Sequence, residues 1–72
     1  MFFNKYNKCV VVSDNKINDT LRVFNELGIS EYEFAELGLG KARVWCVSFK
    51  SSKKQFNKFI SSRVRVEYIA SR

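Results

Sequence analysis

The sequence contains no histidine and no proline, and its 72 residues include only 2 cysteines. Without histidine there is no Ser-His or Cys-His pair for nucleophilic catalysis, and the commonest metal ligand is missing. Cys9 and Cys46 lie too far apart in the sequence to form a paired metal-ligand motif. The glycine-containing stretch 38–41 lacks the length, and the following Ser or Thr, of a phosphate-binding loop. The sequence therefore predicts a protein that is not an enzyme and that holds no metal and no cofactor.

Long hydrophobic runs and linker-like stretches are also missing. No apolar run approaches the roughly 18 residues that span a bilayer, and early polar residues argue against a signal peptide. Because no proline-rich or low-complexity tract interrupts the chain, we expect residues 1–72 to form a single domain. Apolar residues make up 46% of the chain, which is enough for a compact core. We expect a cytoplasmic protein that does not bind membranes. Its cysteines should be reduced and buried. The alternative is a disulfide, because the two predicted strands that hold them could be neighbours.

Negative charge is missing from residues 37–66. Residues 14–36 carry six acidic and two basic side chains, whereas residues 37–66 carry eight basic side chains and no acidic one. The net charge of the whole chain is +6. An acid-free basic region of this length is typical of proteins that bind a polyanion.

Hydrophobic spacing divides the first half of the chain into a strand, a helix and a second strand. Residues 8–13 form a β-branched apolar run, which is typical of a central strand. A short polar residue at 13–15 can cap the helix, and Gly28 suits its left-handed end. Residues 31–37 alternate like a half-exposed strand, and residues 38–40 predict the tight turn of a hairpin. The apolar stripe of the helix is Ile17, Leu21, Phe24 and Leu27.

The second half repeats the order strand, helix, strand. Residues 41–50 form a strand that holds the only tryptophan. Ser52 and Gln55 have the spacing of a capping box, so we expect a helix to begin there and to end near residue 61. Its predicted inner stripe is Phe56, Phe59 and Ile60. Residues 63–69 alternate as a closing strand, and the inward side chains of that strand would be Val64, Val66 and Tyr68.

This β-α-β-β-α-β order resembles the ferredoxin-like arrangement over nearly the whole chain. The resemblance implies an α+β fold, with one four-stranded antiparallel sheet that carries two helices on one face. The RNA-recognition motif shares this order, and Val47-Ser48-Phe49 resembles the end of its third-strand signature, with Lys41 or Arg43 as the leading basic residue. The glycine and the central aromatics of that signature are not present. Acylphosphatase-type enzymes also have this fold, but no matching anion-binding loop follows the first strand.

The strand 41–50 has two faces, and the sequence leaves open which of them is buried. One alternative is that Arg43, Trp45, Val47 and Phe49 face outward and join Arg63 and Arg65 on one surface. The aromatic rings would then offer stacking planes beside phosphate-binding cations. The alternative is that Trp45, Val47 and Phe49 fill the core. A third alternative is that an exposed apolar face is covered in a homodimer. The predicted nucleic-acid-binding residues are Lys41, Arg43, Trp45, Lys50, Lys53, Lys54, Lys58, Arg63 and Arg65.

We therefore expect a small protein that binds nucleic acid, preferably RNA or a protein-RNA complex, through a basic surface. The alternative is an inhibitor or adaptor that uses its sheet or its acidic hairpin to block a partner protein. An acidic protein surface is the alternative partner for the basic residues. The size and the Lys, Asn and Phe content are similar in style to short phage accessory proteins that act against host enzymes or host defence.

Overall fold

A computed structural model describes residues 5–39 and 42–71 of the chain. The first strand leads through a short 3-10 turn, η1, into a helix, and a hairpin, a second helix and a short last strand follow. The elements are β1 (Lys8–Ser13), η1 (Asp14–Lys16), α1 (Ile17–Leu27), β2 (Tyr32–Leu39), β3 (Ala42–Phe49), α2 (Lys53–Ile60) and β4 (Tyr68–Ser71). The described part of the chain has no helix that is long and apolar enough to cross a membrane.

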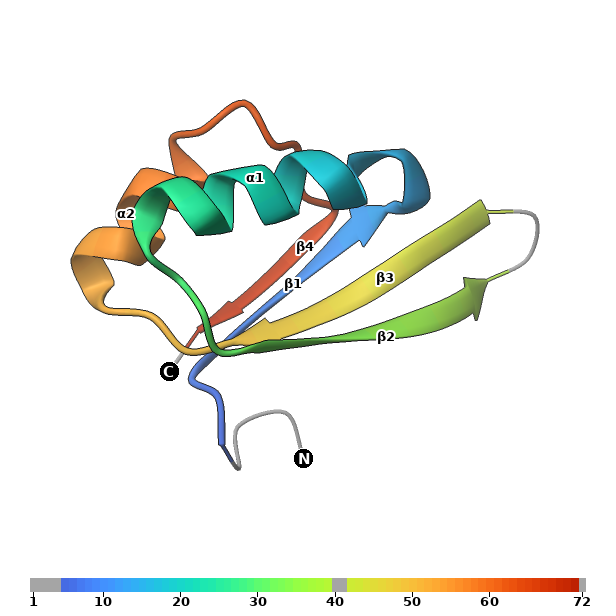
Figure 1. Ribbon diagram of the computed structural model, residues 1–72. Helices are drawn as coiled ribbons and strands as arrows, with labels where there is room; N and C mark the ends of the chain where they lie inside the picture. Colours follow the sequence, from blue (N-terminus) through green and yellow to red (C-terminus); the bar gives the residue numbers. More distant parts are fainter. Residues whose placement is uncertain (1–4, 40–41, 72) are drawn as a thin grey trace.

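The four strands form one antiparallel sheet in the order β2-β3-β1-β4, and both helices cover the same face of it (Figure 1). This confirms the predicted ferredoxin-like α+β fold. In the register, Val10 lies opposite Val47 of β3, and Val12 lies opposite Trp45. Side chains of paired residues lie on the same face of the sheet, so this pairing sets which alternate residues of each strand face the helices.

The core lies between the sheet and the helices and is centred on three phenylalanines. Phe24 of α1, Phe49 of β3 and Phe59 of α2 are fully buried, and the Phe24 ring centroid is 4.7 Å from that of Phe49 and 5.3 Å from that of Phe59. Val10 and Val12 close the sheet side of this cluster. Truncating any of the three rings to alanine removes contacts from three elements at once, at a cost of about 3–5 kcal/mol.

The predicted helix ends are confirmed in three of four cases, and one of these is the end of α2 at Ile60, just before Ser61. Gly28 ends α1 in the left-handed conformation with φ 76°, and Ser52 and Gln55 form a reciprocal capping box at the start of α2. The first helix begins differently from the prediction, because its N-cap is Lys16 instead of a short polar residue at 13–15, and Ser13 makes no side-chain cap hydrogen bond. Its hydroxyl donates to Asn15 Oδ1 at 2.7 Å, and the chain passes through η1 before α1 begins.

The predicted turn at 38–40 is corrected in part. Gly38 and Leu39 belong to β2, where they pair with Arg43 and Ala42. The rest of the turn, at Gly40 and Lys41, lies outside the described residues. The hairpin is therefore longer than the glycine spacing predicted, because a glycine in an edge strand is tolerated where backbone pairing holds it.

The predicted strand 63–69 is wrong over residues 63–67, since β4 begins only at Tyr68. The helix α2 ends in the layer above the sheet, so the chain must first return to the sheet (Figure 1). On this path Val64 is buried in the core as predicted, and Glu67 N–H then donates to the Val11 carbonyl at 2.7 Å. Tyr68 was expected inside but is 61% exposed on the other face of the sheet, and Ile60 of α2 is also exposed.

Candidate nucleic-acid interface

Four of the predicted basic residues gather on and just before α2. Lys53, Lys54 and Lys58 lie on the helix and are exposed, and Lys50 is exposed in the link from β3. Lys54 and Lys58 are one turn apart, so their ammonium groups share one side of the helix. We call Lys50, Lys53, Lys54 and Lys58 the α2 basic surface. The ion pairs within the described chain, Arg22–Asp19 and Arg43–Glu36, both lie outside it.

Side-chain hydrogen bonds hold the start of α2 in place from two directions. The Asn7 amide donates to the Ser51 carbonyl at 3.0 Å, and Ser51 N–H donates back to Asn7 Oδ1 at 3.2 Å. The Gln55 amide accepts from Ser52 N–H at 2.8 Å and donates to the Leu27 carbonyl at 2.9 Å. The link and the helix are thus tied both to the segment before β1 and to the end of α1. The backbone that carries the lysines is therefore ordered before binding, so binding does not have to order it.

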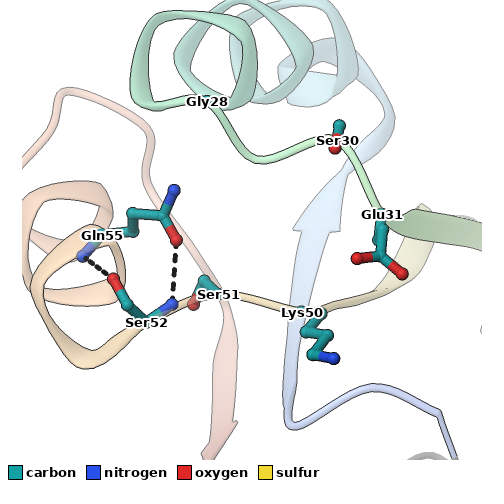
Figure 2. A pocket seen from close by; sticks show the side chains of 7 residues that line it. All are labelled: Gly28, Ser30, Glu31, Lys50, Ser51, Ser52 and Gln55. Carbon is teal, nitrogen blue, oxygen red and sulfur yellow. Dashed lines mark hydrogen bonds between the residues drawn. The ribbon is translucent and has the colours of Figure 1, made fainter.

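A shallow cavity of about 360 Å³ lies beside the start of α2. Figure 2 shows the residues that line it, which are Gly28, Ser30, Glu31, Lys50, Ser51, Ser52 and Gln55. Glu31 and Lys50 lie on adjoining chain segments there, and Lys50 N–H donates to the Glu31 carbonyl at 3.0 Å. The Glu31 carboxylate lowers the positive potential at this end, so the strongest potential of the α2 basic surface lies along the helix itself.

One cation near this surface, Lys8, is not among the residues predicted from the sequence. Lys8 of β1 is 5% exposed, and its Nζ lies 5.3 Å from the centroid of the Phe56 ring on α2. The period-two pattern offered a signal, because Lys8 shares its face with Val10 and Val12, which contact the helices. The Lys8 side chain therefore packs against α2.

Arg43 and Trp45 lie at the other end of the sheet, near the hairpin tip and away from α2 (Figure 1). Arg43 Nε is 2.7 Å from Glu36 Oε2. The hydrogen bond and the charge of Glu36, followed by the charge of Asp14, raise the pKa of Arg43. Trp45 Nε1 donates to Asp14 Oδ1 at 2.7 Å. Both side chains therefore already have an acidic partner, Glu36 for Arg43 and Asp14 for Trp45. The lysines of the α2 basic surface differ from them, because neither ion pair of the described residues includes one of these lysines.

The structure also decides which face of β3 contacts the helices. Val47 and Phe49 are fully buried on the helix side of the sheet, and the half-buried Trp45 ring packs beside them, with its centroid 6.5 Å from that of Phe34. The core alternative for these side chains is therefore correct. The described open face of the sheet carries no stacking platform made by Trp45 or Phe49.

Arg63 and Arg65 lie in the segment between α2 and β4. Arg63 lines a groove of about 510 Å³ against α1, together with the acidic residues Asp19 and Glu26. Arg65 is exposed further along the same segment. Lys41 lies outside the described residues.

Cys9 and Cys46 meet on the open face of the sheet. They are free thiols, both buried, and their sulfur atoms are 3.0 Å apart. Burial, followed by the hydrogen bond and the charge of Cys46, raises the pKa of the Cys9 thiol from 9.0 to about 12. Reduced and buried cysteines agree with the prediction, and such a thiol is a poor nucleophile near neutral pH because the thiolate is rare.

The described residues hold no cluster of His, Cys, Asp and Glu that could bind a metal ion. The chain matches no protein-family model, and no curated protein matches it significantly. Its likeness to ferredoxin-like domains is therefore a likeness of fold, and function has to be argued from the surface.

Proposed function

We propose that this protein binds nucleic acid, with RNA as the preferred target, through the α2 basic surface. One observation carries the proposal: four exposed lysines stand together on an anchored helix and its link, in a region of the sequence that has no acidic residue. Phosphate groups are the partners that such a surface attracts most strongly. Because the rings of Trp45 and Phe49 lie on the helix side of the sheet, binding rests on phosphate contacts and discriminates little between base sequences.

The test is a titration of a fluorescently labelled single-stranded RNA, followed by anisotropy at several salt concentrations. If all four lysines contact phosphates, the logarithm of the association constant should fall against log salt with a slope of about −3. The double variant Lys54→Gln/Lys58→Gln removes two contacts and should make the slope shallower by about 1.4.

A matched control is Arg22→Gln/Arg43→Gln, which removes the same two charges from side chains that are already paired with Asp19 and Glu36. This control should keep the slope of the unaltered protein. Equal loss in both double variants would mean that net charge, rather than the α2 basic surface, drives binding. No binding at low salt would refute the proposal.

A further inference from the structure

Strand β2 forms one edge of the sheet, and no other segment of the described chain pairs with its outer side (Figure 1). It has 8 residues, whereas β4 at the opposite edge has 4. An edge strand presents a row of unpaired backbone N–H and C=O groups, with which an extended segment of another chain can pair. The longer edge of this sheet is therefore the better place for such an addition.

The register shows which backbone groups of β2 are unpaired. Lys50 N–H donates to the Glu31 carbonyl at 3.0 Å, so the odd-numbered residues from Glu31 onwards are the ones that bond to β3. The backbone groups of the even-numbered residues point away from the sheet, and within the described chain these groups have no hydrogen-bond partner. The outward residues are Tyr32, Phe34, Glu36 and Gly38.

The outer side of β2 is accessible at both of its ends. Tyr32 is 37% exposed, and Glu36 and Gly38 are exposed as well. Gly38 has no side chain, so its exposure is that of the backbone itself, and a Cβ atom built there would meet nothing within 4 Å. An incoming strand can therefore reach the outward groups.

The side chains of β2 indicate what kind of segment fits. Glu31 and Glu33 are exposed, lie two residues apart on the face away from the helices, and belong to neither ion pair of the described chain. On the helix side, the ring centroids of Tyr32 and Phe34 are 5.5 Å apart. A strand added to this edge would place alternate side chains beside the carboxylates and beside the rings.

We propose that the outer edge of β2 binds, by strand addition, an extended segment of another protein in which basic and apolar side chains alternate. The basic side chains would lie beside Glu31 and Glu33, and the apolar ones beside Tyr32 and Phe34. Lys50 lies opposite Glu31, next to β2, so Glu33, which lies opposite Ser48, contributes most to the preference for a basic segment. More distant cations of the chain matter less, because charges are screened beyond about 8 Å at physiological salt.

A second copy of this chain fits the edge less well. Residues 31–39 carry three glutamates and no basic residue, so pairing β2 with its own copy would bring two acidic strands together. Like charges across a strand pair are destabilising. The proposal does not depend on whether α2 binds nucleic acid.

A titration with a synthetic peptide tests the proposal on the unaltered protein. The probe is a fluorescein-labelled octapeptide that alternates lysine and valine, followed by anisotropy. Its control peptide has the same composition with all the lysines in one block, so it has the same charge without the alternation. The alternating peptide should bind at least about fivefold more tightly. Equal affinities, or no binding at several hundred micromolar protein, would overturn the proposal.

Amide hydrogen exchange locates the bound peptide without any substitution. The amides of Phe34 and Glu36 point outward, so they should exchange at least about tenfold more slowly when the alternating peptide saturates the protein. The amides of Glu33 and Ala35 already bond to β3 and should change little. Protection that appears elsewhere but not at Phe34 and Glu36 would show that the peptide does not bind this edge.

Two substitutions of one residue form a matched pair. Glu36→Pro removes an outward N–H that the pairing with β3 does not use, and an edge strand tolerates this. Glu36→Ala removes the same carboxylate, which is paired with Arg43, but keeps the N–H. Circular dichroism checks that both variants are folded. Glu36→Pro should bind the alternating peptide at least about fivefold more weakly than Glu36→Ala, and equal binding would contradict the proposal.

Charge and self-association are tested in the same way. Glu33→Gln should weaken peptide binding by about threefold, whereas Glu67→Gln, which removes an exposed charge just before the opposite edge, should leave it unchanged. Equal loss in both variants would mean that net charge alone attracts the peptide, and the proposal would be wrong. It would also be wrong if sedimentation showed that the chain alone dimerises and that Glu36→Pro abolishes the dimer, because the edge would then belong to a second copy.

Discussion

Gln55 joins the two helices, and its replacement gives the sharpest test of how the α2 basic surface is held. One end of its amide accepts from Ser52 N–H at 2.8 Å, and the other donates to the Leu27 carbonyl at 2.9 Å. Gln55→Ala removes both hydrogen bonds. A helix cap and a net intramolecular hydrogen bond are each worth about 1 kcal/mol, so we expect a loss of about 2 kcal/mol in the free energy of unfolding. For a domain of this length that is a large share of the roughly 4–11 kcal/mol available.

Two further variants divide this loss into its parts. Gln55→Glu keeps an acceptor for Ser52 N–H but cannot donate to the Leu27 carbonyl, so it should cost about 1 kcal/mol. The helix N-terminus offsets part of that cost, because it favours a negative charge. Ser52→Ala removes only the hydroxyl that accepts from Gln55 N–H at 3.1 Å and should also cost about 1 kcal/mol.

Urea unfolding, followed in parallel by far-ultraviolet circular dichroism and by Trp45 fluorescence, measures these losses. The double variant Ser52→Ala/Gln55→Ala should lose less than the sum of the two single variants, because both act on the same capping box. A Gln55→Ala protein within a few tenths of a kcal/mol of wild type would refute the reasoning. A Gln55→Glu protein as unstable as Gln55→Ala would show that the cap contributes nothing.

Two other predictions concern the sheet. Because the pKa of Cys9 is raised in the folded state to about 12, the unfolded chain loses this proton first as the pH rises above 9. The contribution of Cys9 to the free energy of unfolding is therefore complete below pH 9 and is lost between pH 9 and 12, with a loss of about 1 kcal/mol at pH 10. In this pH range the wild-type protein should lose stability more steeply than Cys9→Ala. Parallel curves of unfolding free energy against pH would contradict this. Asp14→Ala removes the carboxylate that accepts from Trp45 Nε1, so it should lower the free energy of unfolding by about 1 kcal/mol. It should also make Trp45 more accessible to acrylamide quenching. If neither value changes, the hydrogen bond is not formed in solution.

The basic site could be predicted from sequence only where the residues are local. Lys53, Lys54 and Lys58 belong to one helix with a clear capping box, so their shared exposure follows from helical geometry. Arg43 and Arg63 are basic in the same acid-free stretch, yet both lie beside carboxylates that come from distant parts of the chain. A count of charges along the chain cannot show this, because the acids that surround them belong to residues 14–36.

By itself the sequence determined the order of the elements, the two helices with their ends at Gly28 and at Ser52, and the buried Phe24 and Phe59. These features depend on periodicity and on residues close in the chain. Only the tertiary structure decided that Trp45 faces the helices, that β4 begins as late as Tyr68, and that Cys9 meets Cys46. A strand pattern defines two faces but does not say which one the helices cover. That choice comes from packing, because the sheet and both helices must bury their largest rings together.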